Sequence, residues 1–263
     1  MRSAPTEIDV EGTNTVSSIV TVERPGKLRW VLQPLVCIVI VAASLAYVQT
    51  ANISVTEARS LDVATLLTLL RQHLTASLLA TVIACVIAIP LGVLISRPFM
   101  RRYAKPVITV AGFGQAAPAI GLIAMGAVIF GIGVTGGVAA LVIYGILPIV
   151  ANTVTGLDGV DSRLVEAGRG MGMSARSTLL RVELPLALKV IVAGVRTALV
   201  LIVGTAALIS FTGGGGLGTL ITTGIKLQQN VTLVVGAILV AALALFIDWL
   251  ARLVEIIAEP KGV

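Results

Sequence analysis

The sequence is poor in charged and in aromatic residues. Asp, Glu, Lys and Arg make up 12% of its 263 residues, and Phe, Trp and Tyr make up 4%, whereas a soluble domain carries about 25% charged residues. It has one histidine, His73, and two cysteines, Cys37 and Cys85, which stand in apolar runs without a CxxC spacing. A single histidine excludes a His-rich metal site, and we interpret the cysteines as small apolar side chains within helices. We therefore predict no metal site.

Apolar residues are abundant instead, at 57% of the chain, with a mean hydropathy of +1.03. Six apolar runs are candidates to cross a bilayer as helices, at ~1.5 Å per residue. They cover 28–48, 74–95, 107–132, 137–154, 190–211 and 231–250. The sequence therefore predicts an all-α membrane protein with about six transmembrane helices. A cleaved signal peptide is the alternative for the first run, but the polar stretch before it is long for one.

The basic residues predict how the chain is oriented. Fifteen of the 19 Lys and Arg residues fall in segments on one side of the six runs, three fall on the other side, and Arg196 falls within the fifth run. Basic loops favour the cytoplasm, so both termini are expected there. Because the net charge of +6 lies in these loops, we do not expect nucleic acid as a partner. We expect Arg196 to snorkel to the inner surface or to pair with a neighbour, and Asp248 to pair with Arg252.

Residues 56–74 have an amphipathic pattern. Apolar residues recur there at helical spacing, while Arg59, Asp62 and Arg71 lie off the stripe. The stripe consists of Val63, Leu66, Leu67, Leu70 and Leu74. We interpret this segment as a helix on the outer membrane surface, with His73 as a polar residue near that surface. Extension of the second run is the alternative.

The run "GGGGLG" at 213–218 matches the GxGxxG pattern. A dinucleotide site needs a strand before this pattern and a soluble βαβ unit around it, and here an apolar run precedes it. We instead expect a tight outer loop or hinge, formed by Gly213, Gly214, Gly215, Gly216 and Gly218. Hydroxyl residues surround this loop, and they either line a polar path or bond to helix carbonyls. They are Thr205, Ser210, Thr212, Thr219, Thr222 and Thr223.

A polar island, "EAGRGMGMSARSTLLRVELP", occupies 166–185 within the fourth connecting segment, about 156–189. Arg163, Glu166 and Arg169 are spaced to pair on a helix surface. A second face is small and apolar and suits packing against another protein; it carries Leu164, Ala167, Gly168 and Met171. We expect Gly172 to end this helix, and Ser174 to cap a second short helix that ends near Glu183. Pro185 is expected in the first turn of the next helix.

This island resembles the EAA motif of ATP-binding-cassette (ABC) importer permeases. The motif reads Glu-Ala-Ala, three residues, Gly, nine residues, Ile, one residue, Leu-Pro. The residues that match its spacing are Glu166, Ala167, Gly168, Gly172, Val182, Leu184 and Pro185. Gly168 departs from the usual Ala and Val182 from the usual Ile, and both remain small or β-branched apolar residues.

Further segments, "GQAAPAIGLIAMG", "YGILPIVANTVTGL", "VELPLALKVIVAGVRTA" and "GGGGLGTLI", look like the glycine betaine, carnitine, choline and proline branch, and the similarity spans roughly 72–250. The resemblance implies an importer of compatible solutes in the bacterial inner membrane. It implies two permease subunits, identical or paralogous, two cytoplasmic ATPases that bind ATP and Mg, and an extracytoplasmic solute-binding protein. This chain would then contain no catalytic residue and no cofactor. Besides these protein partners, it would contact membrane lipid.

Under this resemblance the chain divides into four parts. A polar cytoplasmic tail covers 1–27, the first transmembrane helix and an outer loop cover 28–55, the importer domain covers 56–256, and a second tail covers 257–263. The coupling helix that docks on the ATPase would be 163–172. The residues implied in ATPase coupling are Arg163, Glu166, Ala167, Gly168, Arg169, Gly172, Val182, Leu184 and Pro185.

Other functions have less support. The runs contain no chain of buried carboxylates, which a proton- or sodium-driven secondary transporter would need, and no Ser/His/Asp arrangement for an intramembrane enzyme. A permease for an amino acid such as methionine is the alternative within the family. Because aromatic residues are few, we expect solute selection to lie mainly in the binding protein. A translocation path with weak contacts would use Gln115, Pro118, Tyr144, Asn152, Thr205 and Ser210.

Overall fold

The computed structural model describes residues 27–51 and 53–257. This part of the chain consists of α-, 3-10- and π-helices joined by short turns, without a strand. The all-α fold class is thereby confirmed. The two expected polar tails lie, but for one residue each, outside the described residues.

Five helical stretches in the described part are long and apolar enough to cross a membrane. Their main helices are α1 (Lys27–Thr50), α3 (Val63–Ile95), α6 (Val134–Asp158), α9 (Leu184–Thr205) and α11 (Asn230–Ile257). α4 (Ala104–Ala116) and α5 (Ala119–Phe130) form a bent pair, and if this pair crosses the membrane as one span, the number of spans rises to six. The expectation of about six transmembrane helices is confirmed.

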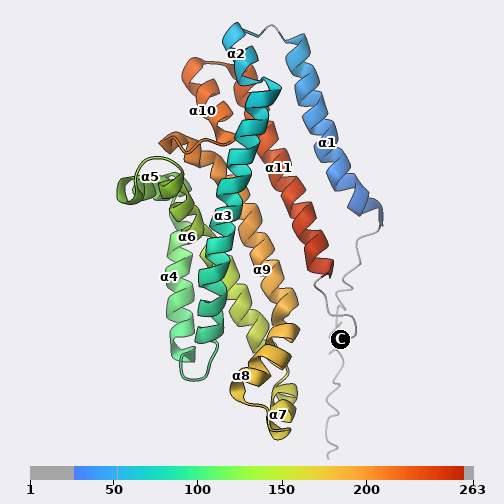
Figure 1. The fold of residues 1–263 in the computed structure, drawn as a ribbon, viewed down its shortest axis with the longest axis vertical. Coiled ribbons are helices and arrows are strands. Elements are labelled where there is room, and N and C mark those ends of the chain that lie inside the picture. The colour runs from blue at the N-terminus through green and yellow to red at the C-terminus, as the bar shows by residue number, and fades with distance from the viewer. Residues whose placement is uncertain (1–26, 52, 258–263) are drawn as a thin grey trace, which may run out of the picture.

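The third apolar run is not one straight helix, contrary to the sequence interpretation. α4 and α5 meet at 97°, so α5 turns sideways at the edge of the bundle (Figure 1). Ala117 has φ −65° and ψ 143°, an extended conformation, and Pro118 follows it at the N-cap of α5. A proline disfavours helical dihedrals in the residue before it and lacks a backbone N–H. Hydropathy alone records neither effect.

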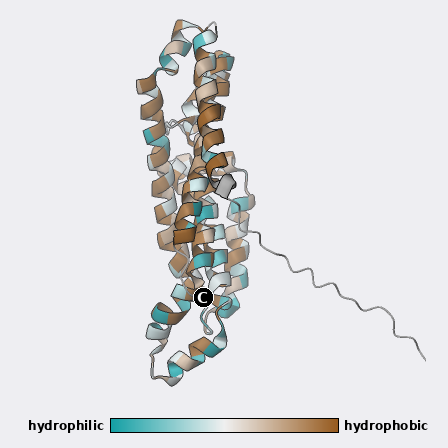
Figure 2. Cartoon of the chain, turned by 90° about the vertical axis from the view of Figure 1, so that its right-hand side faces the viewer, coloured by the Kyte–Doolittle hydropathy of each residue, from teal (hydrophilic) through white to brown (hydrophobic). Residues whose placement is uncertain are grey.

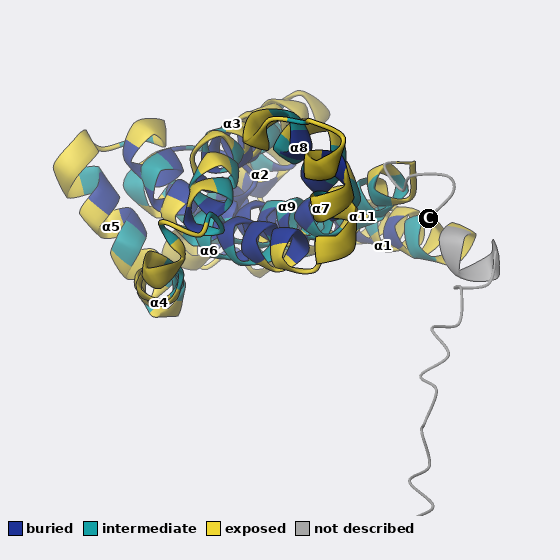
Figure 3. Ribbon diagram, turned by 90° about the horizontal axis from the view of Figure 1, so that it is seen from below, coloured by how far each residue is buried: buried dark blue, intermediate teal, exposed yellow. Residues whose placement is uncertain are grey.

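The main core lies between α3, α6 and α9 (Figure 1). The face of α3 toward this core consists of alanines four residues apart, namely Ala76, Ala80, Ala84 and Ala88. A Cβ on Gly145 of α6 would lie 2.7 Å from Ile202 Cδ1 and 3.3 Å from Ala84 Cβ. Small residues let membrane helices approach this closely. Viewed from below, buried positions gather among these three helices, whereas α4 and α5 project on one side and α1 lies on the other (Figure 3).

The remaining long helices complete the membrane-spanning bundle. α11 packs against α9, and α1 packs against α11. Large apolar side chains remain exposed along the bundle, as at Val31, Val86 and Val128, and apolar residues dominate the long helices (Figure 2). Such surfaces suit contact with lipid hydrocarbon, where apolar side chains need no burial in protein.

The segment 56–74 is not a separate surface helix. α2 (Val55–Ser60) is short and carries a capping box between Ser54 and Glu57. Asp62 then caps α3, which runs unbroken from Val63, so most of the expected amphipathic helix is the first three turns of α3. The alternative, extension of the second run, is correct for 63–74.

His73 is not at the surface either. It is 1% exposed, and its Nε2 lies 2.9 Å from the carbonyl oxygen of Val203 on α9. The tight glycine loop brings Gly216 against the same ring. Hydropathy ranks histidine as polar, but the accessible Val203 carbonyl gives one ring nitrogen a partner in the core.

The connections gather at the two ends of the bundle. α7 (Ser162–Gly170) and α8 (Ala175–Thr178) lie at one end, beside the turn between α3 and α4 that contains the 3-10 helix η1 (Arg101–Tyr103). α2 and α10 (Gly218–Leu227) lie at the other end (Figure 1). α10 lies between the fifth and sixth apolar runs, so the sequence interpretation does not predict it. Hydrophilic residues are frequent around α7 and α8 at the lower end (Figure 2).

Candidate functional site

The polar island forms a helical hairpin at one end of the bundle, and its first helix is α7. Asp161 caps α7, because its Oδ1 accepts the backbone N–H of Arg163 at 2.9 Å. The Arg163 guanidinium also bonds to this carboxylate, with Nη2 2.7 Å from Oδ2. These side-chain bonds, followed by the backbone bond, hold the pKa of Asp161 below its usual value. The expected pairing of Arg163 with Glu166 is therefore wrong, since Asp161 takes the guanidinium.

Gly172 makes the turn that the sequence predicts. Its φ is +86°, a left-handed conformation that is costly for residues with a Cβ. The backbone N–H of Met173 bonds to the Gly168 carbonyl at 3.1 Å and closes the end of α7. Ser174 then caps α8, accepting the N–H of Ser177 at 3.3 Å. The predicted turn and cap are both confirmed.

The second short helix does not end before the fifth span. α8 continues through a π-helical turn, η2 (Leu179–Glu183), directly into α9, and the whole stretch Ala175–Thr212 counts as one apolar span of 38 residues. The Leu184 N–H bonds to the Leu179 carbonyl, five residues back. Pro185 follows at once and has no N–H to donate, so the wider turn lies where α-helical bonding is interrupted. Pro185 thus lies in the first turn of α9, as predicted, although α9 continues α8 and η2 without a break.

The predicted apolar docking face is divided. Leu164 and Met171 are exposed at 48% and 75%, and Ala167 is exposed as well. Gly168 is buried instead, facing Met173, Thr178 and Val182 of its own hairpin. The exposed side of α7 also carries Glu166 and Arg169. α7 therefore presents a mixed charged and apolar surface and holds its glycine against η2.

An ion pair that the sequence interpretation missed joins this hairpin to α3. Arg97 Nη2, just past the end of α3, lies 2.7 Å from Glu183 Oε2 in η2, with side chains exposed at only 21% and 9%. The neighbouring pair of Arg101 and Asp158 is longer, at 3.3 Å, and more exposed. Arg97 and Glu183 are separated by 86 positions in the sequence, so no local spacing of residues could reveal the contact.

The contacts of the six proposed path residues go to other parts of the chain. The Tyr144 hydroxyl donates to the Ala117 carbonyl at 3.4 Å, beside Pro118 at the bend between α4 and α5. Asn152 donates to the Pro148 carbonyl of its own helix at 2.8 Å. The remaining three are only partly buried; they are Gln115, Thr205 and Ser210. Among the described residues, no hydrogen bond joins any two of the six side chains.

The glycine loop is ordered by contacts with α3. Gly213, Gly215 and Gly216 have φ of 77°, 75° and 81°, and the Gly216 N–H donates to Gln72 Oε1 at 3.0 Å. Three of the surrounding hydroxyls bond to helix carbonyls three residues back. They are Ser210, Thr212 and Thr222. Of the two interpretations of these hydroxyls, this supports bonding to helix carbonyls over lining a polar path.

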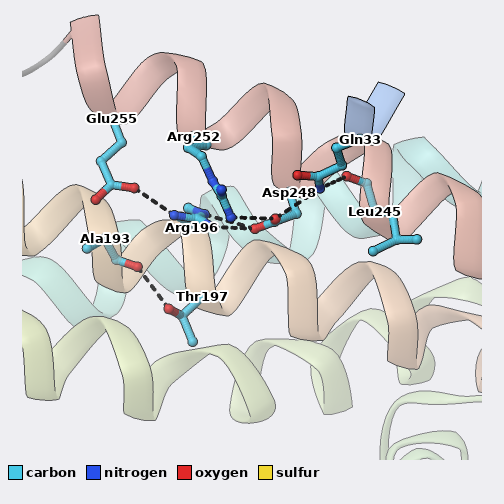
Figure 4. A network of polar contacts seen from close by, with 8 residues as sticks. All are labelled: Gln33, Ala193, Arg196, Thr197, Leu245, Asp248, Arg252 and Glu255. Carbon is cyan, nitrogen blue, oxygen red and sulfur yellow. Dashed lines mark hydrogen bonds and ion pairs between the residues drawn. The ribbon is translucent and has the colours of Figure 1, made fainter. Parts of the chain in front are cut away.

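A charged network joins α1, α9 and α11 (Figure 4). Arg196 bonds to Asp248 at 2.8 Å and to Glu255 at 2.9 Å. Arg252 lies 3.4 Å from Asp248, which confirms the predicted pair, and Gln33 of α1 also donates to Asp248, at 3.3 Å. The neighbour predicted for Arg196 is thus found. The spacing of 248, 252 and 255 along one helix face could have indicated the cluster.

The comparisons with known proteins agree with this architecture. The chain is 39% identical over 191 residues to the glycine betaine/carnitine/choline transport system permease protein OpuCB of Bacillus subtilis (strain 168), covering 73% of this chain and 87% of that protein. It is 41% identical over 197 residues to the osmoprotectant import permease protein OsmW of Salmonella typhimurium (strain LT2), covering 73% and 91%.

The fold matches the MetNI methionine ABC transporter, solved in inward-facing conformations, in its CY5 native crystal form. The TM-score is 0.64 at 23% identity, over 74% of this chain and 96% of that chain. Residues 14–255 match the family described as binding-protein-dependent transport system inner membrane component. This match begins well before residue 72, where the resemblance is expected to start. The chain belongs to this family of inner-membrane components of binding-protein-dependent transport systems.

Proposed function

We propose that this chain is the permease subunit of an ATP-driven importer of compatible solutes of the glycine betaine, choline, carnitine and proline type. The proposal is supported by identities of 39% and 41% to permeases whose names specify glycine betaine, carnitine, choline or osmoprotectants. The aligned regions cover 87% and 91% of these two permeases. The methionine transporter is similar at 23% identity, a level that supports the fold and carries no argument for methionine.

The observation that carries the proposal is the α7 hairpin. An amphipathic helix lies at the end of the bundle and packs against η2 on one side; Leu164 and Glu166 on α7, and Met171 just past its end, are exposed. Through the Gly172 turn α7 is joined to an uninterrupted helical stretch that enters the core. We propose that α7 docks on a cytoplasmic ATPase and that ATP-driven closure of the ATPases moves α9 through this connection.

The remaining partners complete the proposed complex. Two permeases, identical or paralogous, would form the path, two ATPases would hold ATP and Mg, and a binding protein would deliver the solute from outside. The end that bears α7 would face the cytoplasm together with both termini. This orientation is supported by the basic turn at Arg101 and Arg102, which lies at the same end as α7.

Reconstitution tests the function directly. The permease, the ATPases and the binding protein are placed in proteoliposomes, and ATP-dependent uptake of labelled glycine betaine, choline, carnitine, proline and methionine is compared. Uptake of the quaternary amines or proline is expected. Uptake of methionine alone would assign the alternative substrate, and uptake driven by an ion gradient without ATP would contradict an ATP-driven importer.

The docking of α7 is tested with Glu166→Lys. The variant should insert normally and lose uptake, because the charge on the exposed face of α7 is reversed. Lys105→Glu is the control, since it reverses an exposed charge at the same end but outside the hairpin. Normal uptake with Glu166→Lys would contradict docking through this face.

Solute selection is proposed to lie mainly in the binding protein. Exchanging the binding protein should then change the transported solute, while substitutions of Gln115 or Tyr144 should change only the rate. Selectivity that follows Gln115 or Tyr144 and ignores the binding protein would contradict this assignment.

A further inference from the structure

The ion pair between Arg97 and Glu183 lies where the α7 hairpin meets the bundle. The Arg97 guanidinium makes three contacts: Nε donates to the Val93 carbonyl at 3.3 Å, and Nη2 bonds to Ser96 Oγ at 3.3 Å and to Glu183 Oε2 at 2.7 Å. Two of these contacts are to the end of α3: Val93 lies in its last turn, and Ser96 is its C-cap residue. The guanidinium is thus fixed to α3 and reaches out to one carboxylate of η2.

The partner of Arg97, the Glu183 carboxylate, is held in η2 at the base of the α7 hairpin. Glu183 is 7% exposed and is the last residue of η2, two positions before Pro185. The buried side of α7 faces the same segment, since a Cβ at Gly168 would lie 3.7 Å from Thr178 Cγ2 and 3.7 Å from Val182 Cγ2. A displacement of α7 therefore reaches the backbone that carries Glu183 through packed contacts.

The other contacts between η2, α3, α6 and α9 at this end of the bundle are apolar, and apolar contacts are not directional. Leu157 of α6, together with Ala187 and Ile191 of α9, forms a small cluster that also includes Val93 of α3 and Leu179 of η2. Apolar surfaces of this kind allow packed helices to slide past one another. The ion pair is directional and largely removed from water, so it resists such sliding between η2 and α3.

We propose that Arg97 and Glu183 are positioning residues for transport, which make α3 follow the α7 hairpin when the ATPases close. The inference rests on the proposed function, because it requires α7 to be moved by an ATPase. Without the pair, movement of the hairpin would be passed to α9 through the backbone, while α3 would lag behind it. ATP would then be hydrolysed with little solute moved.

The experiment separates transmission from mere stability. The full complex is reconstituted with the binding protein, and the measured quantity is solute transported per ATP hydrolysed, beside membrane abundance and thermal stability of the permease. The variants are Glu183→Met, the double variant Arg97→Met with Glu183→Met, and Arg97→Lys. Arg101→Met is the matched control, since it removes an exposed pair partner in the neighbouring turn.

Glu183→Met leaves Arg97 without its carboxylate, so stability and coupling should both fall. The double variant should recover stability, because apolar replacement of a buried pair is often neutral, but transport per ATP should stay roughly tenfold below wild type. Arg97→Lys keeps the charge and should retain most of the coupling. Arg101→Met should resemble wild type.

Two results would overturn the inference. One is recovery of wild-type transport per ATP in the double variant, which would make the pair structural only. The other is an equal loss in Arg101→Met, which would assign the effect to charge at this end of the protein. A wild-type complex that hydrolyses ATP but moves none of the solutes would instead overturn the proposed function, and the inference with it.

Discussion

The guanidinium of Arg196 on α9 lies 2.8 Å from the carboxylate of Asp248 on α11, within the membrane-spanning bundle. The side chains are exposed at 24% and 18%, and Glu255 and Arg252 continue the network along α11. Ionisable groups inside a membrane protein are costly unless they are paired. The network therefore fixes the position of α11 against α9, and Gln33 extends this bonding to α1.

Arg196→Met should destabilise the protein by about 2 kcal/mol, because it leaves two acidic groups partly buried without their main partner; a fully buried pair would cost about 3–5 kcal/mol. Arg163→Met is the control: its pair with Asp161 is shorter, at 2.7 Å, but the arginine is 87% exposed, and exposed pairs contribute little. Thermal unfolding of both purified variants in detergent checks the difference. Equal losses would show that burial does not decide the contribution.

Gly168→Ala should be tolerated and should stabilise α7 by about 0.5–1 kcal/mol, because glycine in a helix interior costs that much relative to alanine. The new Cβ would lie 3.4 Å from the flexible Met173 Sδ and 3.7 Å from Thr178 Cγ2. Uptake and unfolding temperature are the measurements. Loss of uptake at normal abundance would show that the hairpin needs a glycine for a reason other than space.

Gly136→Ala should destabilise the contact between α5 and α6 by about 1–3 kcal/mol through overpacking. A Cβ there would lie 2.6 Å from the Gly126 carbonyl carbon and 2.7 Å from the Ala127 nitrogen, and backbone cannot move aside cheaply. Gly121→Ala is the control on α5, since nothing lies within 4 Å of its Cβ. The two unfolding temperatures should shift in opposite directions; a neutral Gly136→Ala would mean that α5 packs less closely.

Gly172→Ala should cost about 1–2 kcal/mol, because φ of +86° is unfavourable for a residue with a Cβ. Space is not the reason, since no atom lies within 4 Å of the new Cβ. Gly170→Ala, two residues earlier with equally open surroundings, should be neutral or stabilising. If uptake falls in Gly172→Ala while abundance is unchanged, the turn positions α7 for coupling; parallel falls in both quantities would assign it to folding alone.

Features that depend on local spacing could be predicted from the sequence. The helical fold, the Gly172 turn, the Ser174 cap and the pair of Asp248 and Arg252 each follow from residues within a few positions of one another. Arg97 and Glu183 meet only after the spans have packed, so no periodicity reveals their contact. For Arg196, spacing along α11 could indicate the charged face that it meets, but not that this face packs against α9.

Hydropathy misled the interpretation in two places. It merged α4 and α5 into one run, because the bend at Pro118 changes direction without changing apolar character. It also placed His73 at the surface, because a polar residue in an apolar run is expected to seek water. Hydropathy is averaged over many residues, so it records neither the backbone bend at Pro118 nor the single buried Val203 carbonyl that bonds to His73.

The π-helical turn η2 holds a residue more than an α-helical turn would. Because the wide turn takes up this extra residue, deleting one residue within Leu179–Glu183 would leave α8 and α9 facing almost as they do now. Deleting one residue from the regular turns of α9 beyond Pro185 would instead rotate everything before the deletion by about 100° about the helix axis. α7 would then point in another direction and Glu183 would leave Arg97. The direction of the hairpin is thus set by the number of residues in the α-helical turns, whereas η2 is the place where a change of chain length can be absorbed.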